Sequence, residues 1–143
     1  LSQMFRAARK DDIYMQVNEG YRSSHSQQKI LDNRTDYYKS KGLFTILARR
    51  YALNYVSAPG TSEHQLGLAV DIVGDYRYTT NQSAYRWLER NAYKYGFVKR
   101  YPKSKTSITH IKHEPWHYRY VGKKAALKMH QKNLCLEEYV ESL

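Results

Sequence analysis

The spacing of apolar and polar residues along the chain predicts several helices and strands in an irregular order. Helical spacing covers residues 2–11, 26–41, 43–53, 82–95, 123–132 and 135–142. Alternating or continuous apolar runs predict strands over 13–18, 66–73 and 97–101, with one or two more between residues 108 and 120. Because the two kinds of element do not alternate regularly, we expect an α+β fold with a small, mainly antiparallel sheet flanked by helices.

The cap of one helix, the length of the chain and its first residues add to this picture. Ser24 or Ser26 is expected to cap the helix over 26–41, since serine is favoured at helix N-termini. The 143 residues suit one domain, so we expect residues 1–143 to fold as a single unit. The chain opens on LSQMFRAARKDD, which has the pattern of a helix interior, and Leu1 is not a usual natural start. We therefore expect a fragment that lacks its natural N-terminus.

The charge of the chain indicates an anionic partner. Lysine and arginine number 24 against 13 acidic residues, which gives a net charge of +11 spread along the whole chain. Such a charge suits nucleic acid, but it suits an anionic cell wall equally well. The 15 tyrosines would stack on bases, yet they also fit sheets, cores and sugar-binding grooves. We do not expect nucleic acid to be the partner.

The single cysteine, Cys135, rules out an internal disulfide and a cysteine-rich zinc site. Its neighbours in NLCLEEY include nothing that would activate a thiol. We interpret it as a small buried apolar residue, with a catalytic thiol as the weaker alternative.

An aspartate in an apolar stretch is the first sign of a functional site. Asp71 lies within LGLAVDIV, and a buried carboxylate needs a compensating partner. His64 precedes it by seven residues, and His117 follows Glu114 by three in EPWH. Imidazole nitrogen and carboxylate oxygen both bind zinc, and three protein ligands plus water is the pattern of a catalytic zinc site. Glu114 would then be the general base.

Each of these residues also has an ordinary interpretation. His64 could be a surface histidine, and Asp71 could pair with one of the 24 basic side chains. Glu114 and His117 could be an exposed ion pair. The spacing is not the short His-Glu-x-x-His helix signature, so it leaves these alternatives open.

Three motifs resemble those of a known family. SEHQLGLAVD, residues 62–71, resembles the Ser-x-His-x-x-Gly-x-Ala-x-Asp motif of the VanY-type zinc D-Ala-D-Ala carboxypeptidases. EPWH, 114–117, is similar to the Glu-x-x-His motif that follows, and GYRSSHSQ, 20–27, resembles the upstream Gly-Tyr-Arg-Ser segment. The motifs occur in the family's order over about 20–122. The resemblance implies a zinc peptidase domain with a Hedgehog/D,D-peptidase-like fold, related to L,D-carboxypeptidases and to the VanXY enzymes.

The resemblance also implies a role for each matching residue. His64, Asp71 and His117 take the positions of the ligands of one zinc ion, and Glu114 that of the catalytic base. Four residues take substrate-binding positions: Arg22, Gln27, Ser62 and Trp116. A core tryptophan is an equal interpretation of Trp116. Three further histidines match no ligand position, and we assign them no role: His25, His110 and His113.

The activity implied is zinc-dependent removal of the terminal D-Ala from peptidoglycan stem peptides, with a role in resistance to vancomycin-class antibiotics. The alternatives are L,D-cleavage of tetrapeptide stems and hydrolysis of free D-Ala-D-Ala. A noncatalytic wall-binding module is more remote, because Glu114 accompanies all three ligands. We expect a monomer outside the cytoplasm, at the wall or on a membrane anchor supplied by a missing N-terminus. A VanXY-like protein would instead be cytoplasmic.

Overall fold

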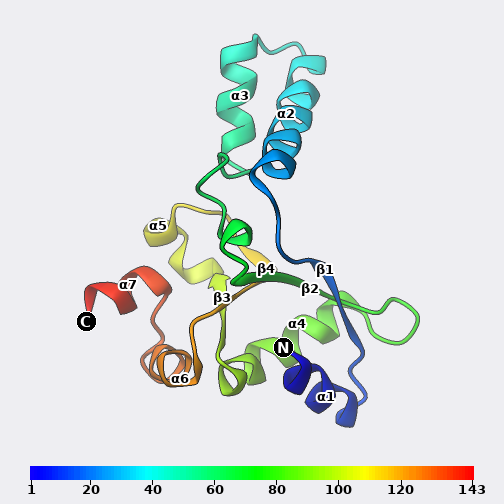
Figure 1. Cartoon of the computed structure of the whole chain (residues 1–143), viewed down its shortest axis with the longest axis vertical. Helices are drawn as coiled ribbons and strands as arrows, with labels where there is room; N and C mark the ends of the chain where they lie inside the picture. Colours follow the sequence, from blue (N-terminus) through cyan, green and yellow to red (C-terminus); the bar gives the residue numbers. More distant parts are fainter.

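The computed structural model describes residues 1–143, in which a four-stranded antiparallel sheet is surrounded by helices (Figure 1). The strands are β1 (Met15–Glu19), β2 (Ala69–Gly74), β3 (Phe97–Tyr101) and β4 (Glu114–Tyr120), in the order β1-β2-β4-β3. The helices are α1 (Ser2–Lys10), α2 (Ser24–Ser40), α3 (Thr45–Leu53), α4 (Asn81–Asn91), α5 (Thr106–Thr109), α6 (Lys123–Lys132) and α7 (Leu136–Glu141). This confirms the α+β class.

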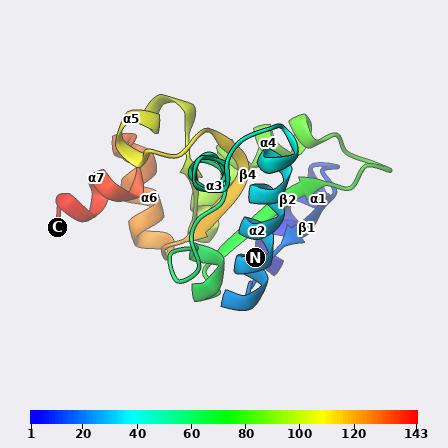
Figure 2. The ribbon, with the colours of Figure 1, turned by 90° about the horizontal axis from the view of Figure 1, so that it is seen from above.

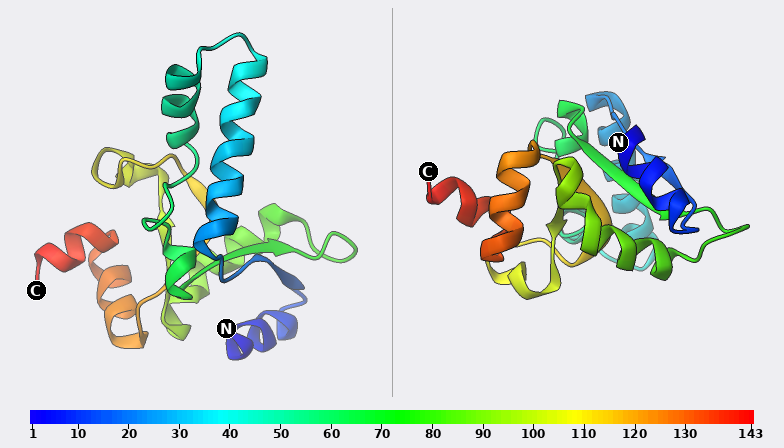
Figure 3. Two further views of the ribbon diagram at one scale, coloured as in Figure 1. Left: turned by 45° about the horizontal axis from the view of Figure 1, so that its top comes forward. Right: turned by 90° about the horizontal axis from the view of Figure 1, so that it is seen from below.

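One face of the sheet carries the main core. The helices α1 and α4 lie against this face, as the view from below shows (Figure 3, right). Val70 and Ile72 of β2 and Tyr118 of β4 join residues of both helices in one buried cluster. Because side chains alternate between the two faces of a strand, the residues between these positions point to the opposite face. Asp71 and His117 therefore face away from the main core.

The helices α2 and α3 form a hairpin that stands over the sheet and projects far beyond it (Figures 1 and 2). Its small core consists of Leu31, Ala52 and Val56. The N-terminal cap of α2 is Ser23, so the expectation of Ser24 or Ser26 is wrong. Ser23 has an extended backbone, and its hydroxyl accepts the N–H of Ser26 at 3.2 Å. Ser26 is instead the residue whose N–H needs the cap.

The strand expected over 66–73 begins later than its apolar pattern indicated. Residues Glu63–Leu66 form one turn of 3₁₀ helix, and Gly67 ends it with φ of +67°. This left-handed conformation suits glycine, and it turns the chain into β2 at Ala69. The polar first part of SEHQLGLAVD, residues 62–71, is thus a turn, and its apolar last part begins β2.

Two other boundaries differ from the pattern. The helix expected over 82–95 is α4 followed by a 3₁₀ turn, Ala92–Tyr95. Of the one or two strands expected between 108 and 120, one forms, β4, and it begins only at Glu114, since Ile108 and Thr109 end α5. None of the helices combines the length and the apolar character that crossing a bilayer requires.

Candidate metal centre

Two of the three expected metal ligands are direct neighbours across the sheet. Asp71 of β2 and His117 of β4 are partners in the antiparallel register. Opposed residues of such a pair project from the same face of the sheet, within reach of each other. His64 lies in the 3₁₀ turn that leads into β2, which brings its ring to the same point. The sheet register thus joins Asp71 and His117, which are 46 positions apart in the sequence.

The side chains of His64, Asp71 and His117 converge tightly. His64 Nε2 lies 3.4 Å and His117 Nδ1 3.2 Å from the same oxygen, Oδ1 of Asp71. One ligand atom from each residue falls within 4.8 Å of the others, and all three side chains are buried. Asp71 has no lysine or arginine partner, so the simple salt-bridge interpretation is wrong.

The site fits a metal ion by its chemistry. Asp71 Oδ1 is buried and has no hydrogen-bond partner, although it faces both imidazoles. An unsatisfied buried carboxylate oxygen costs free energy, and a bound cation would compensate it. Two imidazole nitrogens and one carboxylate oxygen are a donor set that suits zinc, and three ligands leave a position for water or substrate.

The far side of the His64 ring is fixed by the backbone. Its Nδ1 lies 2.7 Å from the carbonyl oxygen of Gly20, which can only accept a hydrogen bond. Nδ1 therefore carries the proton, and in the neutral ring Nε2 keeps its lone pair directed at the centre. Metal-binding histidines are commonly oriented in this way.

The His117 ring is backed by a carboxylate that the sequence reasoning missed. Glu63 Oε2 lies 3.5 Å from His117 Nε2, on the side away from Asp71. Glu63 in turn accepts from Arg100 Nε at 2.7 Å. Arg100 also makes two parallel hydrogen bonds with Glu137 of α7, at 2.7 and 2.9 Å. A chain of charged contacts thus runs from His117 to the last helix.

The electrostatics of the centre follow from this pairing. Burial alone would raise the pKa of Asp71, but the two imidazoles that face it, His117 first and then His64, lower it to about 2. Burial alone would lower the pKa of His117, but Asp71 and Glu63 raise it to about 9. Burial opposes the charged form of Glu63, but His117 and Arg100 favour it, and the pKa of Glu63 falls to about 2. The two carboxylates facing His117 are thus ionised at neutral pH.

Glu114 is placed beside the expected ligands. It begins β4, and its Oε2 lies 3.5 Å from His117 Nδ1. Its side chain is only 22% exposed, so the interpretation of Glu114 and His117 as an exposed pair is wrong. Burial raises the pKa of Glu114, against the opposing pull of His117. A carboxylate with a raised pKa is suited to take up and release a proton.

Arg22 and Gln27 approach the centre from the base of the hairpin. Arg22 Nη1 donates to Gln27 Oε1 at 2.8 Å, and Gln27 Nε2 donates to the carbonyl oxygen of Ser57 at 2.7 Å. The backbone N–H of Arg22 donates to the carbonyl oxygen of His64 at 3.2 Å. Arg22 Nε is buried without a partner, so the guanidinium keeps donor capacity.

A single cavity of about 260 Å³ gathers every expected site residue. Its lining includes all eight, namely Arg22, Gln27, Ser62, His64, Asp71, Glu114, Trp116 and His117. Trp116 is 37% exposed, so it is a wall of the cavity rather than a core residue. The lining also includes Glu63 and Tyr101, which sequence reasoning did not select. His25, His110 and His113 are not among the lining residues, and no role follows for them.

Tyr101 was missed because β3 carries no motif. Its ring lies 5.1 Å from that of His117. Burial, together with the charge of Glu63, raises the pKa of Tyr101 to about 12, so its hydroxyl is a neutral donor at neutral pH. Only the folded structure brings it to the motif residues.

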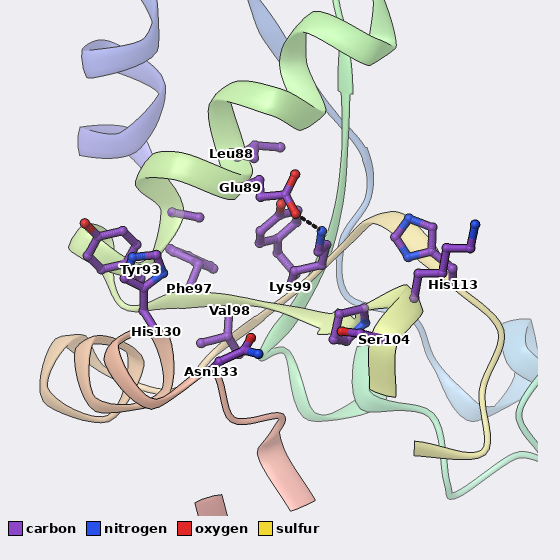
Figure 4. Close-up of a pocket in the computed structure, with 14 residues that line it drawn as sticks. Leu88, Glu89, Tyr93, Phe97, Val98, Lys99, Ser104, His113, His130 and Asn133 are labelled. Atoms are coloured by element: carbon purple, nitrogen blue, oxygen red, sulfur yellow. Dashed lines mark hydrogen bonds and ion pairs between the residues drawn. The ribbon is translucent and has the colours of Figure 1, made fainter. Parts of the chain in front are cut away.

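A larger cavity, of about 550 Å³, lies elsewhere and contains none of the eight residues (Figure 4). The ion pair of Lys99 with Glu89 lies in its wall. Tyr93 and His130 stack at 3.6 Å between ring centres nearby. Size alone would thus point away from the metal centre.

Cys135 is buried, and burial raises the pKa of its thiol, which confirms that it is not a poised nucleophile.

Comparison with known proteins agrees with this geometry. The model of the family VanY, D-alanyl-D-alanine carboxypeptidase, matches residues 1–123. A D-alanyl-D-alanine carboxypeptidase of Enterococcus faecalis (strain ATCC 700802 / V583) is 50% identical over 142 residues, which are 99% of this chain and 53% of that protein. The chain therefore spans about half the length of this curated relative.

Solved structures give the same result. VanYB in complex with D-alanine-D-alanine has a TM-score of 0.93 at 50% identity, covering 98% of this chain and 77% of that one. A mutant of the vancomycin resistance D,D-pentapeptidase VanY in complex with Zn(II) has a TM-score of 0.92 at 50% identity, covering 97% and 78%. The chain belongs to the VanY family of D-alanyl-D-alanine carboxypeptidases.

Proposed function

We propose that residues 1–143 form the catalytic domain of a zinc-dependent D,D-carboxypeptidase that removes the terminal D-Ala of peptidoglycan stem peptides. The observation that carries the proposal is the convergence of His64, Asp71 and His117 beside Glu114. It is supported by the zinc and the D-alanine-D-alanine bound to similar structures.

The three converging residues would hold one zinc ion. When bound, zinc makes a water molecule more acidic and polarises a carbonyl group. Glu114 lies beside the ligands with a carboxylate whose pKa is raised. It would accept the proton of the attacking water and release it to the leaving amine, so that one group serves both halves of the reaction.

Arg22 would recognise the free end of the substrate. A carboxypeptidase must bind a terminal carboxylate, and guanidinium does so with two parallel charge-assisted hydrogen bonds. Gln27 holds Arg22 in place and is itself held by the backbone of Ser57. Ser62 and Trp116 line the same cavity, in which the peptide would lie.

The setting of the enzyme follows from its substrate. Stem peptides belong to the cell wall, so we propose an extracytoplasmic site of action and a contribution to vancomycin-class resistance. The net charge of +11 favours residence near anionic wall polymers. A monomer suffices, because all eight residues of the cavity come from one chain.

Three matched substrates test the proposal. The zinc-loaded protein is incubated with a pentapeptide stem ending in D-Ala-D-Ala, a tetrapeptide stem and free D-Ala-D-Ala, and products are identified by mass spectrometry. We expect the loss of one D-Ala from the pentapeptide. Cleavage of the tetrapeptide alone would indicate an L,D-carboxypeptidase, and cleavage of the free dipeptide alone a dipeptidase. No zinc-dependent cleavage would refute the proposal.

A further inference from the structure

The end of the helical hairpin exposes large apolar side chains to solvent. We call residues 39–50, where α2 passes into α3, the hairpin tip. Phe44 is 86% and Ile46 88% exposed, and Leu47 is 43% exposed. Figures 1 and 3 (left) show this end of the hairpin as the part of the molecule farthest from the sheet. Adjacent large side chains with this exposure mark an interaction surface rather than ordinary scatter.

These side chains contribute little to the fold. The core of the hairpin consists of Leu31, Ala52 and Val56, and Ala48 is buried between the helices. Phe44 precedes α3 at its cap position but makes no side-chain capping hydrogen bond. The apolar surface at the tip therefore needs an explanation outside the folding of the domain.

The apolar side chains are surrounded by positive charge. Four exposed basic residues belong to the tip: Lys39, Lys41, Arg49 and Arg50. No acidic residue occurs between Asp36 and Glu63, and Asp36 pairs only with Lys39. Half-exposed Tyr37 and Tyr51 flank this region on the two helices. The tip thus combines exposed apolar side chains with four basic residues, and aromatic rings lie directly beside it.

We propose that the hairpin tip binds an anionic lipid bilayer, with Phe44, Ile46 and Leu47 entering the headgroup region. The transfer of apolar side chains from water to the boundary of the acyl chains is favourable, and lysine and arginine are attracted to anionic headgroups. Tyrosine is favoured at the same depth. A second copy of the chain is a poorer partner, because two symmetric tips would bring their basic residues together and repel each other.

This arrangement would set the catalytic cavity at a fixed height. The helix α2 has 17 residues and runs from the cavity, where Gln27 lies, to the tip. From Gln27 to its end at Ser40 it rises about 20 Å, at 1.5 Å per residue. The centre would then stand about that far from the bilayer surface. The inference rests on exposure and charge alone and does not depend on the proposed peptidase activity.

Vesicle flotation of the purified chain tests the proposal. Vesicles of phosphatidylcholine alone are compared with vesicles that also contain phosphatidylglycerol. We expect binding to the anionic vesicles that weakens as salt is raised. The variants Phe44→Ser/Ile46→Ser and Lys41→Gln/Arg49→Gln should each lower the partition coefficient about tenfold or more. Their thermal unfolding should match that of the parent chain, because these side chains lie outside the core.

Matched controls separate the tip from general effects. Tyr76→Ser removes an aromatic side chain of equal exposure, 86%, and Lys123→Gln/Lys124→Gln removes two exposed charges from α6. Both should bind vesicles as the parent does. The proposal is overturned if the parent fails to bind anionic vesicles, or if the tip variants bind as well as the controls. It is also overturned if light scattering reveals a dimer that only the tip variants abolish.

Discussion

Asp71 is the residue on which the centre depends. In β2 its neighbours Val70 and Ile72 face the main core, so the alternation of the strand turns Asp71 to the opposite face. There it meets His64 and His117 and no lysine or arginine. A carboxylate held between two imidazoles, with a buried oxygen that lacks a hydrogen bond, is explained by a cation.

Replacing Asp71 with asparagine separates this explanation from a purely structural one. We expect Asp71→Asn to weaken zinc binding by more than about 100-fold, the upper range for the loss of groups that only orient a ligand. Competition with a chromophoric chelator measures the affinity, and unfolding without metal measures stability. Unchanged zinc affinity together with lower stability would show that Asp71 serves the fold instead.

Glu63 tests the orientation of His117. Its carboxylate lies 3.5 Å from His117 Nε2, on the side of the ring away from the centre. Glu63→Gln should weaken zinc affinity about 10- to 100-fold, because the ring loses the charge that orients it. Glu89→Gln is the control, since Glu89 is also paired but lies outside the cavity of the metal centre. Equal zinc affinity in the two variants would show that Glu63 does not orient His117.

At the scale of elements, Arg100 ties three segments together. From β3 it reaches Glu63 in the turn before β2 and Glu137 in α7. The Arg100 side chain is only 11% exposed, so these contacts are shielded from solvent. The last helix thus braces the turn that carries His64, although the family model matches only residues 1–123.

Removal of this guanidinium should destabilise the domain. Arg100→Leu removes the bidentate partner of Glu137 and the nearest partner of Glu63, which keeps only Arg119 and His117 at 3.5 Å. We expect a loss of about 3 kcal/mol in the free energy of unfolding. Urea unfolding measures it. Arg77→Leu is the matched control, because its bidentate pair with Asp75 is exposed and should contribute little. If the two variants unfold alike, Arg100 is not a brace.

The elements also show what a single sequence can reveal. The alternating pattern located β1, and the apolar run located β2, because burial of one or both faces leaves a local signature. The 3₁₀ turn at Glu63–Leu66 and the short helix α5 have no such signature, so neither is predicted, and the expected strands overlap only their last residues. Motif residues of the cavity could be selected, whereas Tyr101 and Glu63 reach it only through the sheet register and the pairing with Arg100.

At the scale of the molecule, the sheet separates stability from chemistry. One face packs against α1 and α4 in the main core, and the other presents the three candidate metal ligands beneath the hairpin. The rigid sheet fixes Asp71 and His117, while the base of the hairpin supplies Arg22 and Gln27. A site that draws on both parts would suit the proposed function, in which a peptide lies between the candidate metal ligands and Arg22.

The most direct test is a paired measurement of zinc content and turnover in Glu114→Gln and His117→Ala. We expect Glu114→Gln to keep one zinc ion by elemental analysis and to lose most of its rate on the pentapeptide stem, because only proton transfer is removed. His117→Ala should lose both metal and activity. Near-normal turnover in Glu114→Gln would show that Glu114 is not the base, and full zinc occupancy in His117→Ala would show that His117 is not a ligand.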